Sequence, residues 1–314
     1  MTRALITGVN GFCARHLVAR LRKETGYEVI GSDLAPPESG TSDLHVFRPA
    51  DIGDPRQVRR LIEDVAPDVI FNLAGSRGAN ARDVYRANLL AVTHLLEACR
   101  GFERDTKFLQ VGSAAEYGVV ESVDLPVTES HACSPVGAYG ASKFAATIAC
   151  LEYADRFGMK VVVARPFNVV GAGISENLVL GAVAARARKA LCEGAEPVIR
   201  AGNLDGRRDF VAVGDVVEAY VTMVAGAHWG QVFNLCSGES RSIRDVLMML
   251  LSNSPVRFRI EVDKRLVPTF EVRSIHGSCE KARNAFGFAP RVPIETALAS
   301  VWNGGVCGKP PCAS

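Results

Sequence analysis

Residues 4–33 read ALITGVNGFCARHLVARLRKETGYEVIGSD, and this stretch decides the fold class. The residues at 4–7 are apolar or β-branched and predict a short strand. A turn with two glycines follows, after which Leu17, Val18 and Leu21 recur at helical spacing. A second apolar strand then ends at Asp33. The stretch therefore predicts a strand, a tight turn, a helix and a second strand parallel to the first.

The same alternation of apolar strands and helical patterns continues along the chain. Further strands are expected in DVIFNLAG (68–75), KFLQVGS (107–113) and MKVVVARPFN (159–168), and the clearest helix between them is VYRANLLAVTHLLEACR (84–100). Strands that are apolar on both faces belong to a sheet covered by helices on each side. We therefore expect an α/β protein with a Rossmann-type, doubly wound parallel sheet.

The turn Gly8-x-x-Gly11-x-x-Ala14 follows a strand and opens a helix, which is the setting of a dinucleotide-binding motif. Gly8 allows the tight turn, Gly11 lets the backbone approach a pyrophosphate, and the helix N-terminus offers N–H groups to the anion. Asp33 is placed to accept hydrogen bonds from the adenosine ribose. Its charge would repel a 2′-phosphate, so NAD(H) is favoured over NADP(H). The alternative is an ordinary glycine-rich turn, with Asp33 capping the strand end.

After Asn168 the pattern changes to a glycine-rich loop, a long helix in NLVLGAVAARARKALCEG (177–194) and short strands. We expect residues 1–167 to form the dinucleotide-binding domain, with 205–236 returning to it. Residues 168–204 and 237–302 would build a smaller C-terminal α/β lobe that binds the substrate. The last segment, NGGVCGKPPCAS (303–314), is rich in Gly, Pro and Cys, lacks periodicity and is expected to be a disordered tail.

Three residues are candidates for the reacting centre. Tyr139 and Lys143 are four positions apart at the start of a helical stretch, so they share one face. A tyrosine with a pKa near 10 is a poor base at neutral pH, and a nearby ammonium group that stabilises phenolate meets this need. Ser113 ends a predicted strand, at the edge of the sheet where ligands bind in this class of fold. The trio can exchange a proton with a sugar or alcohol oxygen.

Composition narrows the possible functions. The chain has 314 residues, 48% of them hydrophobic, and its 36 Lys and Arg against 34 Asp and Glu leave a net charge of +2. This balance does not favour nucleic acid or an anionic membrane as a partner, and no apolar stretch approaches the roughly 20 residues of a membrane helix. The N-terminus lacks the features of a secretory signal, so we expect a cytoplasmic protein. Nine cysteines without a CxxC pair predict reduced thiols and no metal site.

Together these residues resemble the extended short-chain dehydrogenase/reductases that act on nucleotide-diphosphate sugars. The resemblance covers the chain to about Trp302 and rests on TGVNGF, DIGD, NLAG, the strand ending in Ser113, Tyr139-x-x-x-Lys143 and ARPFNVVGAG. Within this family of epimerases, dehydratases and reductases, the segments AGNLDGRRDFVAVGDVVEAY and VFNLCSGESRSIRDVLMMLL are most similar to GDP-4-keto-6-deoxy-mannose reductases. GDP-mannose 4,6-dehydratases are more distant.

The resemblance implies roles for further residues. Catalysis is assigned to Ser113, Tyr139 and Lys143. The cofactor-binding residues implied are Gly8, Asn10, Gly11, Phe12, Asp33, Asp51, Ile52, Leu73, Ala74, Gly75, Asn88, Tyr139, Lys143 and Pro166. The substrate-binding residues implied are Ser76, Ala114, Glu116, Asn168, Arg208, Arg265 and Glu271. Asn168 and Arg208 would contact the substrate diphosphate, for which a guanidinium group is well suited. A homodimer through the helices that carry LLAVTHLLEA and KFAATIACLEYA is also implied.

We expect an NAD(P)-dependent oxidoreductase that reduces a 4-keto-6-deoxy-hexose, carried on a nucleotide diphosphate, at C4. An NAD-retaining 4-epimerase is the alternative, because Asp33 suits NAD. A 4,6-dehydratase is disfavoured because Ala115 stands where those enzymes carry a glutamate, although Glu116 is adjacent. The segment VDKRLVPTFEVRS departs from the reductase pattern and leaves the nucleotide base open. A non-catalytic dinucleotide-binding protein is less consistent with an intact Ser, Tyr and Lys trio.

Overall fold

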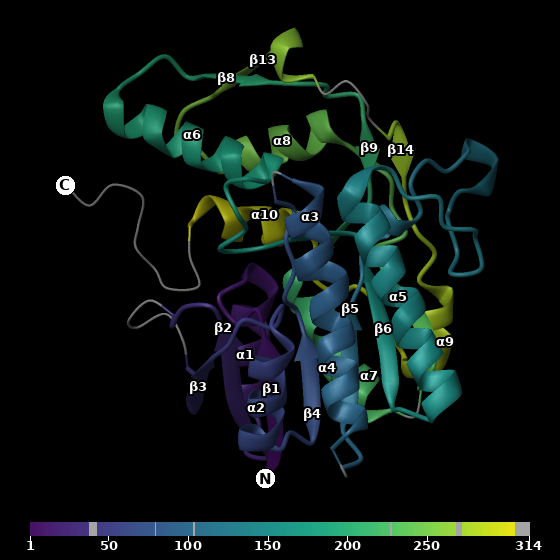
Figure 1. The fold of residues 1–314 in the computed structure, drawn as a ribbon. Helices are drawn as coiled ribbons and strands as arrows, with labels where there is room; N and C mark the ends of the chain where they lie inside the picture. Colours follow the sequence, from purple (N-terminus) through teal and green to yellow (C-terminus); the bar gives the residue numbers. More distant parts are fainter. Residues whose placement is uncertain (38–42, 79, 103, 227, 268–271, 305–314) are drawn as a thin grey trace.

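A seven-stranded parallel sheet forms the centre of the computed structural model, which describes residues 1–37, 43–78, 80–102, 104–226, 228–267 and 272–304 (Figure 1). The strand order is β11-β6-β5-β4-β1-β2-β3. The strands are β1 (Thr2–Thr7), β2 (Tyr27–Asp33), β3 (Val46–Pro49), β4 (Val69–Asn72), β5 (Lys107–Val111), β6 (Val161–Pro166) and β11 (Gln231–Leu235). In chain order, the sheet first grows from β1 through β2 to β3, and then from β4 to β11 on the other side of β1. Ligands of a doubly wound sheet bind in the crevice where this direction changes.

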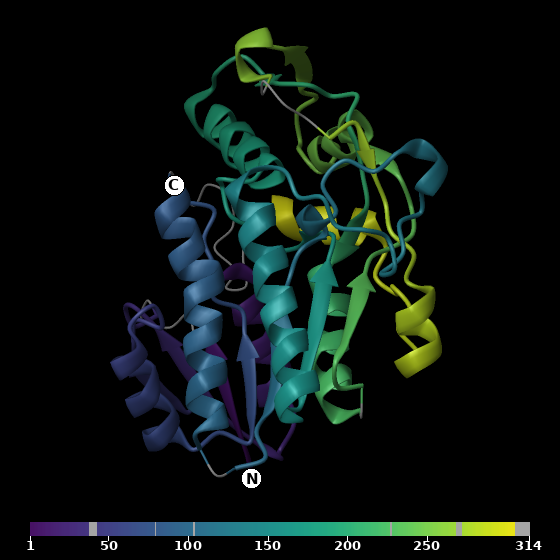
Figure 2. The same ribbon diagram turned by 45° about the vertical axis from the view of Figure 1, so that its right-hand side comes forward.

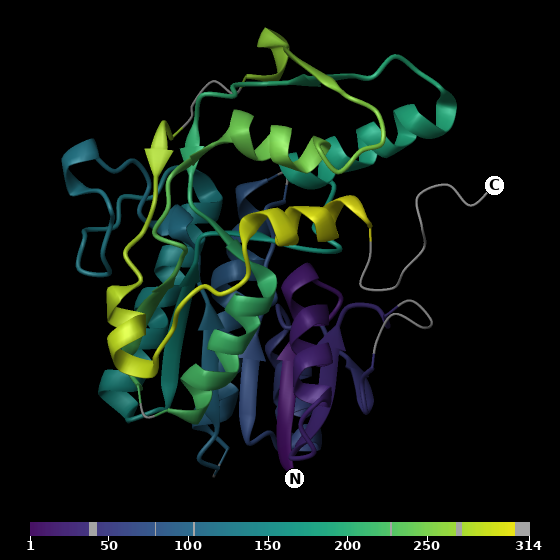
Figure 3. The ribbon, with the colours of Figure 1, turned by 180° about the vertical axis from the view of Figure 1, so that it is seen from behind.

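Helices cover both faces of the sheet, as the apolar strands require. Within β1, Ala4 and Ile6 belong to one buried cluster and Leu5 to another, because successive side chains of a strand point to opposite faces. The first cluster packs under α1 (Phe12–Arg22) and α7 (Val213–Ala225), seen in Figure 3. The second packs under α2 (Pro55–Val65), α4 (Ala91–Arg100) and α5 (Gly137–Phe157). The predicted fold class is confirmed.

The helix predicted over 84–100 is divided in the structure. It consists of α3 (Ala81–Tyr85), a π-helical segment Arg86–Leu90 and α4. Asn80 caps α3, its side chain accepting a hydrogen bond from the backbone N–H of Asp83 at 2.9 Å. Hydrophobic spacing does not distinguish an α-helix from a single wide turn, so the sequence did not predict the π segment. Its one fully buried residue is Asn88.

A smaller lobe lies above the carboxyl ends of the strands, and the strand arrows point toward it (Figure 2). Its buried cluster joins side chains of α6 (Val179–Glu193), α8 (Ile243–Leu251) and α10 (Ile294–Trp302). Short strands pair around it: β8 (Val198–Ala201) with β13 (Arg259–Val262), β10 (Phe210–Ala212) with β7 (Asn168–Val170), and β9 (Arg207–Arg208) with both β12 (Arg241–Ser242) and β14 (Ser274–Ile275). Single 3₁₀ turns lie at Ala114–Glu116, Ser122–Asp124 and Lys264–Leu266.

Residues 205–302 divide between the sheet and the lobe in an interleaved way. Helix α7 and strand β11 belong to the central α/β layers. Helix α9 (Glu280–Phe286) also packs against β11, and its Ala282 is part of the same buried cluster as α1 and α7. The segment 237–302 therefore does not lie wholly within the cluster of the lobe. In the expected tail, residues 305–314 lie outside the described part of the chain.

Two further findings concern the helices and the cysteines. Among the described residues, no helix has the length and apolar character needed to cross a membrane. Cys13, Cys99, Cys133, Cys150, Cys236 and Cys279 are free thiols, whereas Cys192, near the end of α6, is disulfide-bonded. The expectation of reduced thiols is thus wrong at Cys192, because periodicity along the chain says nothing about which sulfur atoms meet.

Candidate active site

The glycine turn after β1 has the close backbone approach that the motif predicts. Gly8 has a φ of +67°, and a Cβ atom there would lie 2.6 Å from the Cα of Ala74. The N–H of Gly11 donates to the Gly8 carbonyl at 2.9 Å, which closes the turn immediately before α1. Only glycine fits the first position without strain. The turn thus meets the residues that follow β4, and the two strand ends share one site.

Asp33 ends β2 beside this turn. Its carboxylate accepts the N–H of Asn10 at 3.1 Å and the N–H of Leu34 at 2.8 Å. The Asn10 side chain donates in turn to the Ala35 carbonyl at 2.8 Å. Asp33 therefore braces the glycine turn, and each carboxylate oxygen keeps acceptor capacity for a further donor.

The segment after β4 is held by Asn88. Its Oδ1 atom accepts the N–H of Ser76 at 2.7 Å, and its Nδ2 atom donates to the Ser76 carbonyl at 2.8 Å. A Cβ atom on Gly75 would lie 2.9 Å from Asn88 Oδ1 and 3.1 Å from Lys143 Nζ. Asn88 is fully buried, and its amide is engaged by protein groups. It therefore shapes the loop that holds Leu73, Ala74 and Gly75.

Ser113, Tyr139 and Lys143 come together at the carboxyl end of β5. Lys143 is buried, and its Nζ atom donates to the Val111 carbonyl at 2.9 Å. The Ser113 side chain is close enough to the phenol of Tyr139 to contribute to the lowering of its pKa. The structure thus assembles the three residues from the end of one strand and the first turns of α5, as their spacing predicts.

A chain of hydrogen-bonded polar side chains within the sheet leads to the carbonyl group that holds Lys143. Thr7 Oγ1 donates to Asn72 Oδ1 at 2.5 Å, and Asn72 Nδ2 donates to Gln110 Oε1 at 2.7 Å. Gln110 Nε2 then donates to the Val111 carbonyl at 3.0 Å, the same oxygen that holds Lys143. Buried polar groups need such partners, and a fully paired chain holds its members in one geometry.

The pKa of Tyr139 lies below the ordinary value of 10. Burial by itself raises this pKa. The positive charges of Lys143 and Arg77 and the polar side chain of Ser113 outweigh the effect of burial, because they stabilise the phenolate. The guanidinium carbon of Arg77 lies 4.4 Å from the centre of the Tyr139 ring. The phenol is therefore prepared to exchange a proton nearer to neutral pH than a free tyrosine.

Glu116 does not have the expected position of a substrate contact. It is fully buried, and its Oε2 atom accepts hydrogen bonds from Arg165 Nη2 at 2.8 Å and from Thr147 at 2.9 Å. Its Oε1 atom accepts the N–H of Ser113 at 2.7 Å. The expectation that Glu116 contacts the substrate is therefore wrong, because its carboxylate is buried in an ion pair with Arg165. Glu116 instead holds the backbone of Ser113.

Other expected cofactor contacts lie around the same edge. The ring of Phe12 packs edge-on against His16, with 5.4 Å between ring centres, beside the loop that contains Gly171. Pro166 is buried at the end of β6. Asp51 accepts the N–H of Gly53 at 2.8 Å and forms an ion pair with Arg86. The carbonyl of Ile52 contacts His94. Ala114, which was expected to contact the substrate, is buried in the 3₁₀ turn after Ser113.

The expected substrate contacts in the lobe are more dispersed. Asn168 follows β6, and its side chain donates to the Asp209 carbonyl at 2.8 Å. Arg208 lies in β9, and its Nη1 atom donates to the Arg207 carbonyl at 2.9 Å. Arg265 is largely exposed and forms an ion pair with Asp263 at 2.7 Å. Glu271 lies outside the described residues.

Two residues that sequence reasoning missed contact expected site residues: Arg77 contacts Tyr139, and the backbone of Asp209 contacts Asn168. Arg77 lies in the loop after β4, two residues beyond the NLAG motif, and a lone loop arginine carries no pattern that indicates a contact with Tyr139. Asp209 is fully buried between Arg208 and β10. Its carboxylate accepts hydrogen bonds from the N–H groups of Ser237 at 2.7 Å and Gly238 at 2.9 Å. The signal in the sequence was an aspartate directly before the apolar residues that form β10. A carboxylate that is buried at such a position needs several hydrogen-bond donors around it.

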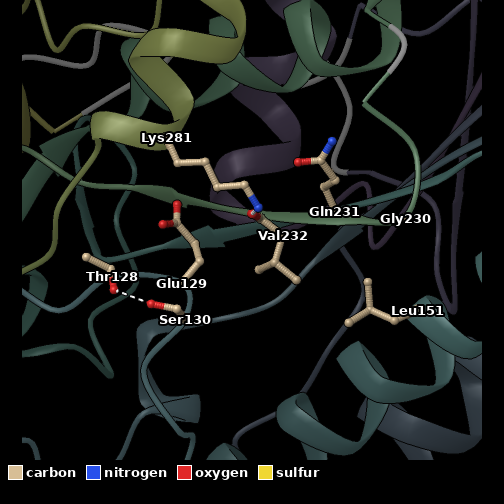
Figure 4. A pocket seen from close by; sticks show the side chains of 8 residues that line it. All are labelled: Thr128, Glu129, Ser130, Leu151, Gly230, Gln231, Val232 and Lys281. Carbon is tan, nitrogen blue, oxygen red and sulfur yellow. Dashed lines mark hydrogen bonds between the residues drawn. The ribbon is translucent and has the colours of Figure 1, made fainter.

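A hollow of about 480 Å³ lies elsewhere, along the outer edge of β11 (Figure 4). Glu129 there accepts the N–H of Asn234 at 2.7 Å, and Lys281 Nζ donates to the Val232 carbonyl at 2.9 Å. These side chains occupy backbone groups that an edge strand would otherwise leave open to another strand. The hollow contains none of the expected site residues, so it is separate from the Tyr139 centre. In the described part of the chain, no group of three or more His, Cys, Asp and Glu residues is arranged to hold a metal ion.

The sequence and the fold are similar to those of known proteins. Residues 4–236 match the NAD dependent epimerase/dehydratase family. A GDP-6-deoxy-D-mannose reductase of Pseudomonas aeruginosa is 30% identical over 305 residues, 95% of each chain. A solved structure of RMD from Pseudomonas aeruginosa in complex with NADPH has a TM-score of 0.84 at 28% identity, covering 96% of this chain and 98% of the other. A putative epimerase from Burkholderia cenocepacia J2315 has a TM-score of 0.85 at 34% identity, covering 96% and 97%.

Proposed function

The chain belongs to the NAD dependent epimerase/dehydratase family, and on that premise we propose that it reduces a nucleotide-diphosphate-bound 4-keto-6-deoxy-hexose at C4. The observation that carries the proposal is the assembly of Ser113, Tyr139 and Lys143 at the carboxyl ends of the strands, with the pKa of Tyr139 lowered. The similarity to a GDP-6-deoxy-D-mannose reductase over 95% of the chain supports the reaction type.

The residues present fit a nicotinamide dinucleotide. Gly8 and Gly11 leave the backbone bare at the N-terminus of α1, where N–H groups and the helix dipole favour a pyrophosphate. Asp33 lies beside this turn with acceptor capacity for the ribose hydroxyls. We propose a preference for NAD(H), since a 2′-phosphate at Asp33 would meet a like charge. When bound, the nicotinamide supplies or accepts the hydride.

The protein groups supply the proton. In the reducing direction, the phenol of Tyr139 donates its proton to the oxygen on C4 as negative charge develops there. Lys143 stabilises the resulting phenolate and is held in place by the Val111 carbonyl. Ser113 orients the carbonyl oxygen by hydrogen bonding, and Glu116 fixes the backbone of Ser113. A positioned acid of this kind contributes about 10²–10⁴-fold to the rate.

The buried ion pair strengthens the case against a 4,6-dehydratase. That reaction needs an acid/base group that removes a proton from the sugar and assists the loss of water. Ala115 has no ionisable side chain, and the adjacent Glu116 is fully buried against Arg165. The carboxylate of Glu116 is therefore enclosed by Arg165, Thr147 and the backbone of Ser113.

An NAD-retaining 4-epimerase is the second candidate, favoured by Asp33 and by the 34% identity to a putative epimerase. The two reactions differ in stoichiometry. A reductase consumes one NADH for each sugar, whereas an epimerase returns the hydride and shows no net consumption. Following NADH absorbance with 4-keto-6-deoxy sugars and with unmodified nucleotide hexoses separates them.

The Tyr139→Phe variant tests both candidates. We expect nucleotide and cofactor binding to persist, measured as thermal stabilisation by each ligand, because the ring remains. Turnover should fall by about 100-fold or more, because the transferred proton is lost. Unchanged turnover in this variant would overturn the assignment.

We also propose that the protein is a homodimer. Leu90, the last residue of the π-helical segment, and Ile148, on α5, are 47% and 51% exposed. Helices α4 and α5 lie side by side on one outer face (Figure 1), and a second copy of the chain packed on this face would cover both side chains. Sedimentation of the wild type and of Leu90→Glu tests this, since a charge in the interface should give a monomer.

A further inference from the structure

A second cation lies against the ring of Tyr139. The guanidinium carbon of Arg77 is 4.4 Å from the ring centre, well within the roughly 6 Å over which cation–π attraction acts. The attraction grows when the ring carries negative charge, so the contact favours the ionised phenol over the neutral one.

The loop that carries Arg77 is fixed to the same helix as Tyr139. Asn88 forms two hydrogen bonds with the backbone of Ser76, at 2.7 and 2.8 Å, so the residue before Arg77 is held on both sides. Asn88 Nδ2 also donates to Ser142 Oγ at 2.9 Å, and that hydroxyl donates to the Tyr139 carbonyl at 2.9 Å. One buried amide therefore ties the backbone before Arg77 to the helical turn that carries Tyr139.

The groups that face Tyr139 come from several elements. Lys143 lies on α5, Ser113 at the end of β5 and Tyr220 on α7. Tyr220 is buried, and this burial is the main reason why its pKa lies well above 10; the neighbouring Cys13 and Tyr139 raise the pKa further. Tyr220 therefore stays neutral. The charges that act on Tyr139 among these groups are those of Lys143 and Arg77.

We propose that Arg77 is a positioning residue for proton transfer, whose stacked guanidinium stabilises the Tyr139 phenolate and thereby sets the pH range in which the site works. The inference rests on the proposed function for its role in turnover. The contact itself concerns only the protein and can be tested without a substrate.

The test compares Arg77→Met, Arg77→Gln and Arg77→Lys with a control, Arg82→Met, which removes one positive charge from the neighbouring α3. Phenolate formation at Tyr139 is followed by ultraviolet absorbance, as the difference between each protein and its Tyr139→Phe counterpart. We expect Arg77→Met and Arg77→Gln to shift the titration to higher pH, with about a tenfold lower phenolate-to-phenol ratio at a fixed pH, the lower end of the effect of an opposite charge at this distance. Arg77→Lys should recover part of the shift, and Arg82→Met should match the wild type.

A titration unmoved in both neutral variants, or moved equally by Arg82→Met, would overturn the proposal. The pH profile of kcat/KM should shift with the titration when a sugar substrate is turned over. If no nucleotide sugar is turned over, the proposed function fails, whereas the absorbance titration still decides whether Arg77 acts on Tyr139.

Discussion

Replacing Arg165 with methionine should destabilise the protein strongly. Glu116 is fully buried, and Arg165 is 3% exposed. The guanidinium donates to Glu116 Oε2 from Nε at 3.1 Å and from Nη2 at 2.8 Å. Without it, a carboxylate remains buried with no compensating charge, which costs about 3–5 kcal/mol of unfolding free energy.

The double variant Glu116→Gln/Arg165→Met separates charge from packing. The amide oxygen of the new glutamine can still accept the N–H of Ser113, and its NH2 group can donate to the hydroxyl oxygen of Thr147, so the losses are mainly the two bonds from Arg165. At about 1 kcal/mol each, the double variant should lose about 2 kcal/mol. It should therefore be more stable than the single variant, although it carries one more substitution.

Urea unfolding followed by circular dichroism measures these differences as shifts in midpoint. Lys189→Met is the matched control, because Lys189 pairs with Glu193 at 3.8 Å on the exposed face of α6. Losing such a surface pair costs less than about 1 kcal/mol. The reasoning is refuted if Arg165→Met costs no more than the control, or if the double variant is the less stable of the two.

Three further predictions concern the site. Gly8→Ala should lose about 1–3 kcal/mol of unfolding free energy, because alanine is strained at the positive φ of this position. It should also weaken NAD(H) binding measured by calorimetry, since the new Cβ atom meets the backbone of Ala74. Wild-type affinity for NAD(H) in this variant would contradict the prediction. Asp33→Asn should improve the KM for NADP(H) relative to NAD(H) by about fivefold or more, equivalent to about 1 kcal/mol of relieved repulsion; an unchanged ratio in steady-state kinetics would count against it. The rate of reduction should be constant at low pH and fall as pH rises through the lowered pKa of Tyr139, because the protonated phenol donates the proton. The rate of the reverse oxidation should rise over the same pH range, because the phenolate accepts the proton. A pH profile without opposite trends would show that another group transfers the proton.

Much of the site could be predicted because its determinants are local. Gly8 and Gly11 follow a strand and precede a helix, and Tyr139 and Lys143 are one helical turn apart, so short-range spacing carries the information. Glu116 was misjudged because its partner, Arg165, is 49 residues away. Nothing in the spacing of the two residues indicates that they meet inside the protein.

The order of apolar strands and helices in the sequence determines a parallel sheet covered on both faces, since such strands can bury their backbone groups only against one another. It also determines that polar residues at several strand ends share one edge. Tertiary structure alone decides which charged groups at that edge face a ligand and which are sealed by a partner. The reason is physical: burial and electrostatic attraction act over distances in space, and the contacts of Arg77 with Tyr139 and of Arg165 with Glu116 join segments that the chain keeps far apart.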